Sequence, residues 1–155
     1  MSDGEPHIVV GIDDSLGARH ALHWAAKEAK LRHARLDVIH VWAVPAQWAQ
    51  GYGVEWTIDL EVLGGDAQSV AEELVAGMLT EAERPDKLTV NAIEGNASSV
   101  LLEASKSADL LVVGTRGRGG FARLLLGSVS SAIVHHAVCP VAIIPVPPEA
   151  DESED

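Results

Sequence analysis

Apolar residues along the chain form short continuous runs that alternate with longer stretches of helical spacing. The short runs predict five β-strands, over residues 8–12, 36–42, 88–93, 109–113 and 141–144. Apolar residues repeated every three or four positions predict helices over residues 16–31, 66–83, 97–106 and 128–137. Residues 43–64 carry proline, glycine and two tryptophans without clear periodicity, which indicates a long, partly ordered connection.

The order of these elements predicts the architecture. A repeat of strand and helix implies right-handed crossovers between parallel strands, with helices on both faces of the sheet. We therefore expect an α/β fold, doubly wound, in three α/β/α layers. Ligands of such sheets bind beyond the carboxyl ends of the strands, where the strand order reverses. This rule selects Asp13, after the first strand, and Gly114, after the fourth, as neighbours.

The composition fits a single globular domain, since 47% of the 155 residues are hydrophobic. The acidic N-terminus leads into an apolar run too short for a secretion signal or a membrane span, and the lone Cys139 fits a reducing compartment. We therefore expect a cytoplasmic protein without a membrane partner. The last seven residues include five acids, so residues 147–155 are expected to form an acidic disordered tail.

The formal net charge of -12 argues against nucleic-acid binding, which needs clustered Lys and Arg facing phosphates. The charge is unevenly distributed, however. Residues 110–148 contain no Asp or Glu, and their charged side chains are Arg116, Arg118 and Arg123. One arginine of this segment, with Arg116 as the candidate, is expected to reach an oxygen of a bound phosphate.

The glycines of this same segment favour a phosphate site. Gly114 and Gly117 follow a buried strand, where the chain must turn and where a missing Cβ lets a ligand approach the main chain. Gly127 and Ser128 then open a helix, whose free N–H groups and positive dipole end attract anions. Ser128 and Ser130 can add hydroxyl donors. The glycines and hydroxyls together predict a cradle for a nucleotide phosphate.

Other motifs for phosphate or metal binding do not fit. There is no GxxxxGK[ST] sequence, which excludes a P-loop. Residues 117–122 match GxGxxA, but they follow the fourth strand and no acid comes within about 20 positions, so a dinucleotide fingerprint is rejected. The pair Asp13-Asp14 resembles that of a phosphorelay receiver, yet the third strand ends in Glu94 and the fifth has no Lys. Adjacent helical histidines, His135 and His136, diverge by about 100° and do not indicate a metal site.

The glycine spacing and both ends of the chain resemble a known family. Gly114-x2-Gly117-x9-Gly127-Ser128 has the form G-x2-G-x9-G-[ST], the first strand leads through VVGID, and the last lies in VCPVAIIP. This pattern resembles the universal stress protein family, in the spacing of its ATP-binding branch. The resemblance implies a flexible N-terminus over residues 1–6, a universal stress protein domain over residues 7–146, and a sheet of order 3-2-1-4-5. It also implies ATP, accompanied by Mg²⁺, between strands one and four.

The resemblance also assigns roles to individual positions. The phosphate contacts of the family fall on the backbone of Gly117, Gly127, Ser128, Val129 and Ser130. Asp13 matches the acidic residue near the ribose or the metal-bound phosphates, and Val41 the position whose main chain reads the adenine edge. Ile12, beside Asp13, is expected to line the same cleft. The turn Glu94-Gly95-Asn96-Ala97 departs from the Gly-x-Pro turn that is frequent in the family.

These expectations favour a nucleotide-dependent stress-response regulator over an enzyme. Asp13 could orient a water or hold Mg²⁺, but the loop supplies no second carboxylate, Lys or Gln of the kind that phosphoryl transfer requires. No catalytic residue is therefore assigned, and at most weak ATP hydrolysis is expected. One alternative is a slow ATPase or a cyclic-nucleotide (cAMP) binder that uses the same cleft. Another is a nucleotide-free dimerisation module.

The last strand predicts a self-association surface. In the order 3-2-1-4-5 the strand VAII, between Pro140 and Pro145, lies at an edge of the sheet. It is apolar on both faces and carries no charge to discourage pairing with another strand. We therefore expect a homodimer through residues 141–145, and the family resemblance points the same way.

Overall fold

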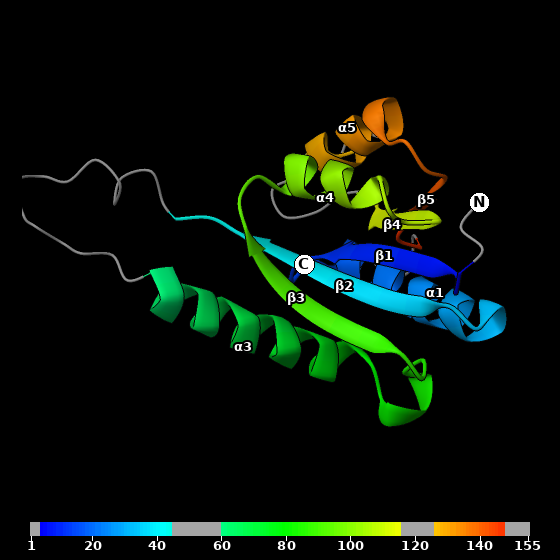
Figure 1. Cartoon of the computed structure of the whole chain (residues 1–155), viewed down its shortest axis with the longest axis horizontal. Coiled ribbons are helices and arrows are strands. Elements are labelled where there is room, and N and C mark those ends of the chain that lie inside the picture. Colours follow the sequence, from blue (N-terminus) through cyan, green and yellow to red (C-terminus); the bar gives the residue numbers. More distant parts are fainter. Residues whose placement is uncertain (1–3, 45–59, 116–125, 148–155) are drawn as a thin grey trace, which may run out of the picture.

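All of the predicted strands form, and they pair in parallel in one sheet. The computed structural model describes residues 4–44, 60–115 and 126–147. Within them the strands are β1 (His7–Ile12), β2 (Arg35–Trp42), β3 (Leu88–Glu94), β4 (Leu110–Gly114) and β5 (Val141–Ile144). They form a five-stranded sheet of order β3-β2-β1-β4-β5, as expected (Figure 1).

Helices cover both faces of this sheet (Figure 1). They are α1 (Leu16–Arg32), α3 (Leu60–Met78), α4 (Ala97–Ser105) and α5 (Ser128–His136), with a short 3-10 helix η1 (Glu81–Glu83). Alternate residues of the central strands supply the two cores. Ile8 and Val10 of β1 pack with α1 and α3, whereas Val9 packs with α4 and α5. The predicted three-layer doubly wound fold is therefore confirmed.

Helix α1 begins and ends where its sequence provides caps. The side chain of Ser15 accepts a hydrogen bond from the Ala18 N–H at 3.1 Å, which is the usual N-cap contact. The helix ends at His33, whose left-handed backbone (φ 52°) lets its N–H reach the carbonyls of Ala29 and Lys30. Its buried face is rich in alanine, so the helix lies close to the central strands.

The second long helix differs from the prediction at both ends. It begins at Leu60 instead of residue 66, because Gly64 and Gly65 continue the helix instead of ending the connection before it. A Cβ on Gly64 would lie 3.7 Å from the Trp42 ring, so the helix packs against the end of β2 at this glycine. The helix stops at Met78, and Thr80 then donates its N–H to Glu83 at 2.8 Å to begin η1. The prediction of a single helix over residues 66–83 was therefore wrong in its bounds.

The turn after β3 needs its glycine. Gly95 has a positive φ of 147°, and its N–H donates to the Trp42 carbonyl at 2.8 Å, which closes the end of the β2–β3 pair. Asn96 then caps α4 by accepting from the Ser99 N–H at 3.1 Å. The expected turn at Glu94-Gly95-Asn96 thus forms. Among the helices in the described ranges, none is long and apolar enough to cross a bilayer.

Candidate functional site at the carboxyl edge of the sheet

The carboxyl ends of β1 and β4 lie side by side, as the topology rule predicts. The two strands pair from Ile8 with Leu110 to Val10 with Val112. Asp13 follows β1 directly and Gly114 ends β4, so both lie at the same edge of the sheet. The first residue of α5, Ser128, follows Gly127, whose N–H donates to the carbonyl of Thr115 at 2.6 Å. Sequence positions more than a hundred residues apart are therefore brought to one edge.

Asp13 is partly exposed and faces the start of α1. Its Oδ1 accepts the Ser15 N–H at 2.9 Å, one residue before that helix begins. A carboxylate at this position interacts favourably with the positive end of the helix dipole. Asp13 thus anchors the β1–α1 turn while its carboxylate lies at the carboxyl edge.

Ile12 and Val41 lie on opposite faces of the sheet. The Ile12 side chain is 6% exposed and belongs to the core beneath α1, so its side chain is a packing residue. Its carbonyl oxygen lies 3.3 Å from His40 Nδ1. Val41 is partly buried and packs with the core beneath α4 and α5. It therefore lies on the face of the sheet that α5 covers. Of these two predicted lining residues, Val41 is therefore the one on the face of the α5 N-terminus.

The space left by the missing side chain of Gly114 is filled from within the protein. A Cβ at Gly114 would lie 2.9 Å from the carbonyl carbon and oxygen of Gly17 in α1. Such contacts essentially never occur for real Cβ atoms, and backbone atoms cannot swing aside. Gly114 therefore lets α1 approach β4, and this packing role explains the glycine independently of any ligand.

The N-terminus of α5 presents backbone donors that the helix itself does not use. Gly127 is the N-cap residue, with an extended backbone (φ -75°, ψ 175°) and no side-chain cap within the described residues. The Ser131 N–H makes a helical bond to the Gly127 carbonyl at 2.9 Å. By helix geometry the preceding N–H groups, those of Ser128, Val129 and Ser130, have no partner inside the helix. They form a set of donors at the positive end of the dipole, which suits an anion.

The two predicted serine hydroxyls have different surroundings. Ser130 is 3% exposed, and its hydroxyl donates to the Thr115 carbonyl at 2.8 Å, with the Gly127 carbonyl a second acceptor at 3.2 Å. A hydroxyl has one hydrogen to donate, and the shorter of these contacts is to Thr115. The Ser130 hydroxyl therefore fastens the end of β4 to the start of α5. Ser128 is exposed. Ser128 is therefore the serine whose hydroxyl lies at the surface, and Ser130 holds the two ends of the loop together.

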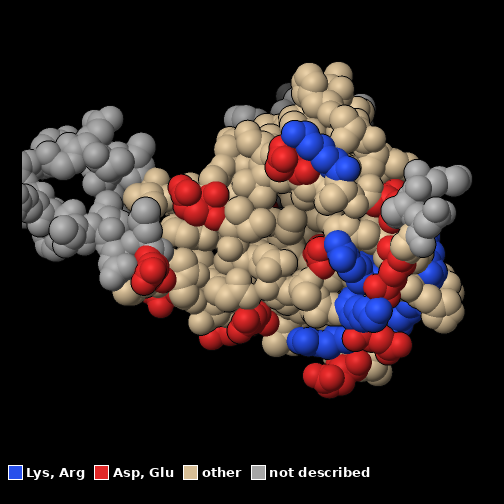
Figure 2. Space-filling view, viewed as in Figure 1, with Lys and Arg blue, Asp and Glu red and all other residues tan. Residues whose placement is uncertain are grey.

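Arg116 and Gly117, the other predicted contacts of this loop, lie outside the described residues. Their roles stay predictions. On the face seen in Figure 2, Lys and Arg gather together with acidic groups over the amino-terminal ends of the strands, and further acidic groups lie along α3. That helix carries Glu61, Asp66, Glu72 and Glu73 and no basic residue. The N–H donors at the start of α5 are therefore the feature of this edge that suits an anion best among the described residues.

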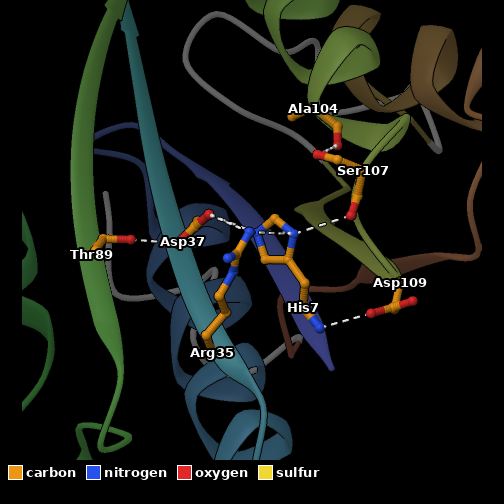
Figure 3. Close-up of polar contacts among 7 residues, drawn as sticks. All are labelled: His7, Arg35, Asp37, Thr89, Ala104, Ser107 and Asp109. Atoms are coloured by element: carbon orange, nitrogen blue, oxygen red, sulfur yellow. Dashed lines mark hydrogen bonds and ion pairs between the residues drawn. The ribbon is translucent and has the colours of Figure 1, made fainter. Parts of the chain in front are cut away.

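A second polar cluster, which sequence reasoning missed, lies at the opposite, amino-terminal edge (Figure 3). His7 is buried, with Nε2 2.6 Å from Asp37 Oδ2 and Nδ1 3.2 Å from the Ser107 carbonyl oxygen. Asp109 accepts the His7 N–H at 2.8 Å, and Thr89 donates to the second oxygen of Asp37. The cluster joins β1, β2, β3 and the start of β4. No motif signals it, because its members meet only through the strand register.

Metal-binding residues do not gather in the described ranges. No group of three or more His, Cys, Asp or Glu side chains that could hold a metal ion occurs there. Mg²⁺ commonly binds through one or two carboxylates together with substrate phosphates and waters. Asp13, a partly exposed carboxylate at the carboxyl edge, fits that limited role.

The fold and this edge define an α/β protein of the doubly wound class, with helix N–H donors where such proteins hold ligands. A sequence profile of the universal stress protein family matches residues 6–145. The chain belongs to the universal stress protein family. A universal stress protein of Mycolicibacterium smegmatis is 36% identical over 148 residues, which cover 93% of this chain and 49% of that protein. The chain spans about half the length of the curated relatives that it matches.

Solved structures share the fold. A universal stress protein crystallised in complex with cAMP has a TM-score of 0.66 at 21% identity, and the match covers 92% of this chain and 98% of that one. A universal stress protein from Archaeoglobus fulgidus in complex with dAMP has a TM-score of 0.62 at 20% identity, covering 91% and 98%. At these identities the likeness establishes the arrangement of strands and helices.

Proposed function

We propose that this chain is an ATP-binding universal stress protein that acts as a nucleotide-dependent regulator of the stress response. The observation that carries the proposal is the start of α5, where the N–H groups of Ser128, Val129 and Ser130 have no helical partner and Gly127 supplies no side-chain cap. Phosphate is the ligand that such a helix end suits best. The solved relatives with cAMP and dAMP, which are both adenine nucleotides, support adenine as the base.

Each residue of the proposed site has one task. The α5 N–H groups and the exposed Ser128 hydroxyl donate to phosphate oxygens, with Gly117 and Arg116 as further contacts from the loop. Asp13 lies near the ribose or binds a Mg²⁺ ion that the phosphates also bind, because a carboxylate oxygen is a ligand that Mg²⁺ prefers. Val41, on the face toward which α5 begins, offers its main chain to the adenine edge. Mg²⁺, when bound, would neutralise phosphate charge.

A binding role fits these residues better than a catalytic one. The buried Ser130 hydroxyl donates to the Thr115 carbonyl, so it is not directed at a phosphate, and the proposal uses the Asp13 carboxylate for the ribose or Mg²⁺ instead of as a base for an attacking water. We therefore assign no catalytic residue and expect at most weak ATP hydrolysis. A ligand that bridges α5 and the end of β1 would stabilise one arrangement of this edge. The resulting shift in population is the proposed signal, and it requires different affinities in the two states.

The same site would accept a cyclic nucleotide. Helix N–H donors bind any phosphate, and the solved relative with cAMP gives this alternative a specific basis. A cyclic nucleotide has a single phosphodiester group with one ionisable oxygen, whereas the triphosphate of ATP has several. The relative affinities of ATP and cAMP, measured by competition for the site, therefore distinguish the two ligands.

We further propose that two copies pair through residues 141–145. All four residues of β5 are apolar and partly buried in the single chain. The β4–β5 bonds use the carbonyls of Pro140 and Ile144, so the N–H and C=O groups of Val141 and Ile143 face outward. An apolar edge of this kind favours pairing with a second strand. Sedimentation as a single chain at micromolar concentration would contradict this pairing.

The direct test of the ligand is chemical. Freshly purified protein is denatured without added nucleotide, and the released small molecules are separated by chromatography and identified by mass. Close to one ATP per chain is the expected result. Bound cAMP would favour the alternative, and ADP or AMP would favour hydrolysis. The proposal fails if no adenine nucleotide is released and a titration with ATP or cAMP in Mg²⁺ produces no binding heat.

A further inference from the structure

The two edges of the sheet are chemically different, and Gln68 of α3 makes the difference. Strand β3 forms one edge, and α3 runs beside it (Figure 1). Gln68 Nε2 donates to the Val90 carbonyl at 2.7 Å, and the Ala92 N–H donates to Gln68 Oε1 at 2.8 Å. One side-chain amide thus occupies a carbonyl and an N–H in the middle of the edge strand.

These two backbone groups are those that a neighbouring strand would use. The Leu36 N–H donates to the Lys87 carbonyl, and the Gly95 N–H donates to the Trp42 carbonyl. The odd-numbered residues of β3 therefore direct their N–H and C=O groups toward β2. Even-numbered residues, Val90 and Ala92 among them, direct their N–H and C=O groups away from the sheet. A parallel partner strand bonds its neighbour through a carbonyl and the N–H two residues later. Gln68 supplies the same donor and acceptor.

The third contact of Gln68 fixes which way its amide points. Nε2 also donates to Glu72 Oε1 at 3.0 Å, one turn along α3. A reversed amide would place its NH₂ group against the Ala92 N–H and its oxygen against the Val90 carbonyl and the Glu72 carboxylate. All of these contacts would then be repulsive. The carboxylate of Glu72 therefore holds the amide in the orientation that matches the strand.

The opposite edge has no equivalent among the described residues. Val141 and Ile143 of β5 direct their N–H and C=O groups outward, and no hydrogen bond from the described part of the chain reaches them. Neither face of that strand carries a polar side chain. An open apolar edge and a capped edge therefore lie at the two ends of one sheet.

We propose that Gln68 is an edge cap that prevents β3 from pairing with a second copy of this chain and so restricts strand pairing to β5. The proposal rests on the self-pairing of β5 proposed above. Two pairing edges per chain would allow each added copy to expose another edge, and assembly would not close. With β3 capped, pairing through β5 ends at two chains. The interaction surface of β3 is thus present but occupied by the protein's own side chain.

Amide hydrogen exchange tests the cap at the level of single residues. In the Gln68→Leu variant, which keeps a side chain of similar size, the Ala92 amide is expected to exchange roughly tenfold faster, because it loses its hydrogen-bond acceptor. The Asn91 amide, which faces β2, is the internal reference and keeps its exchange rate. Equal exchange of Ala92 in the variant and the original chain overturns the cap.

Light scattering on a sizing column tests the consequence for assembly. The Gln68→Leu variant is expected to form species larger than the original chain does, increasingly so with concentration. Gln68→Glu is expected to do the same, because an ionised carboxylate accepts from Ala92 but cannot donate to Val90. This second variant keeps the test decisive if Leu disturbs folding. Ser69→Ala, whose hydroxyl bonds only within α3, is the matched control and is expected to leave the mass unchanged.

A combined variant separates failure of the cap from failure of the β5 dimer. Ile143→Pro removes an outward N–H of β5 without removing a bond to β4. The chain with Ile143→Pro and Gln68→Leu together is expected to stop at two copies, paired through β3. If β5 does not pair, the original chain has the mass of one copy, yet Gln68→Leu still increases it. If Gln68→Leu and Gln68→Glu both leave the mass unchanged, the cap proposal is wrong.

Discussion

Gly114, at the end of β4, lies against the backbone of Gly17 in α1, so that a Cβ at position 114 would stand 2.9 Å from the Gly17 carbonyl group. Gly114→Ala is therefore expected to destabilise the fold by about 1–3 kcal/mol, since neither backbone can yield without moving α1. Urea unfolding measures this change. If the free energy of unfolding stays the same, the close approach of α1 to β4 is not required.

A glycine of α3 provides the matched control for this substitution. A Cβ at Gly77 would meet no atom within 4 Å. Gly77→Ala is expected to stabilise the protein by about 0.5–1 kcal/mol, because alanine loses less conformational entropy in a helix. The two Gly→Ala changes thus have opposite signs in the same unfolding experiment. A destabilising Gly77→Ala would mean that something else approaches the helix at this point.

Substitution of Ser128 separates the backbone donor from the hydroxyl. Gly127 has the extended backbone that a residue before proline prefers, and Ser128 is the first helical residue, where proline is tolerated. Ser128→Pro removes the N–H and the hydroxyl, whereas Ser128→Ala removes the hydroxyl alone. ATP affinity, measured by calorimetry, is expected to fall roughly tenfold to a hundredfold further in Ser128→Pro than in Ser128→Ala. Equal affinities would show that this N–H does not bind phosphate.

The amino-edge cluster is expected to stabilise the fold without affecting the nucleotide. Asp37→Asn replaces the carboxylate that contacts His7 and accepts from Thr89 by a neutral amide, which removes the charge from both contacts. We expect a loss of about 1–3 kcal/mol in the free energy of unfolding and no change in ATP affinity. The exposed Asp86→Asn serves as control and should change neither. A weaker affinity for ATP in Asp37→Asn would show that the cluster at the amino-terminal edge affects the site at the carboxyl edge.

Burial makes the thiol of Cys139 less acidic. Desolvation raises the pKa of this thiol, so at a given pH it holds less thiolate than an unburied cysteine, and the thiolate is the reactive form. Alkylation with iodoacetamide is expected to be slow at neutral pH and to rise only at a higher pH than for a cysteine in a short peptide. The pH dependence of the alkylation rate measures this. A midpoint below that of the peptide would contradict a packing role for Cys139.

The fold could be predicted because its signals are local. Each strand is a short apolar run, and the alternation of strands with helical spacing selects a parallel sheet. The ends of the second helix were less predictable. The glycines at 64 and 65 suggested a connection, but packing against Trp42 overrides the low helix propensity of glycine. The start of η1 had a readable signal, since Thr80 and Glu83 have the spacing of a capping box.

The candidate site was predicted in position but not in detail. The strand order, which the family resemblance implied and the structure confirms, places Asp13 and the start of α5 at one edge. The contact of Gly114 with Gly17, and the direction of the Ser130 hydroxyl, depend on how α1 and α5 pack. Gln68 gave no signal either, because its match to β3 depends on which carbonyls and N–H groups face outward.

The central claim is that a nucleotide phosphate binds the N-terminus of α5, and one NMR titration tests it most directly. The nitrogen-labelled, nucleotide-free protein is titrated with ATP and Mg²⁺ while the backbone amides are followed individually. We predict saturable shifts of the Ser128, Val129 and Ser130 amides together with Asp13, and no shift of His7 at the other edge. Unchanged α5 amides at saturating ATP, or shifts confined to the surroundings of His7, would contradict the account.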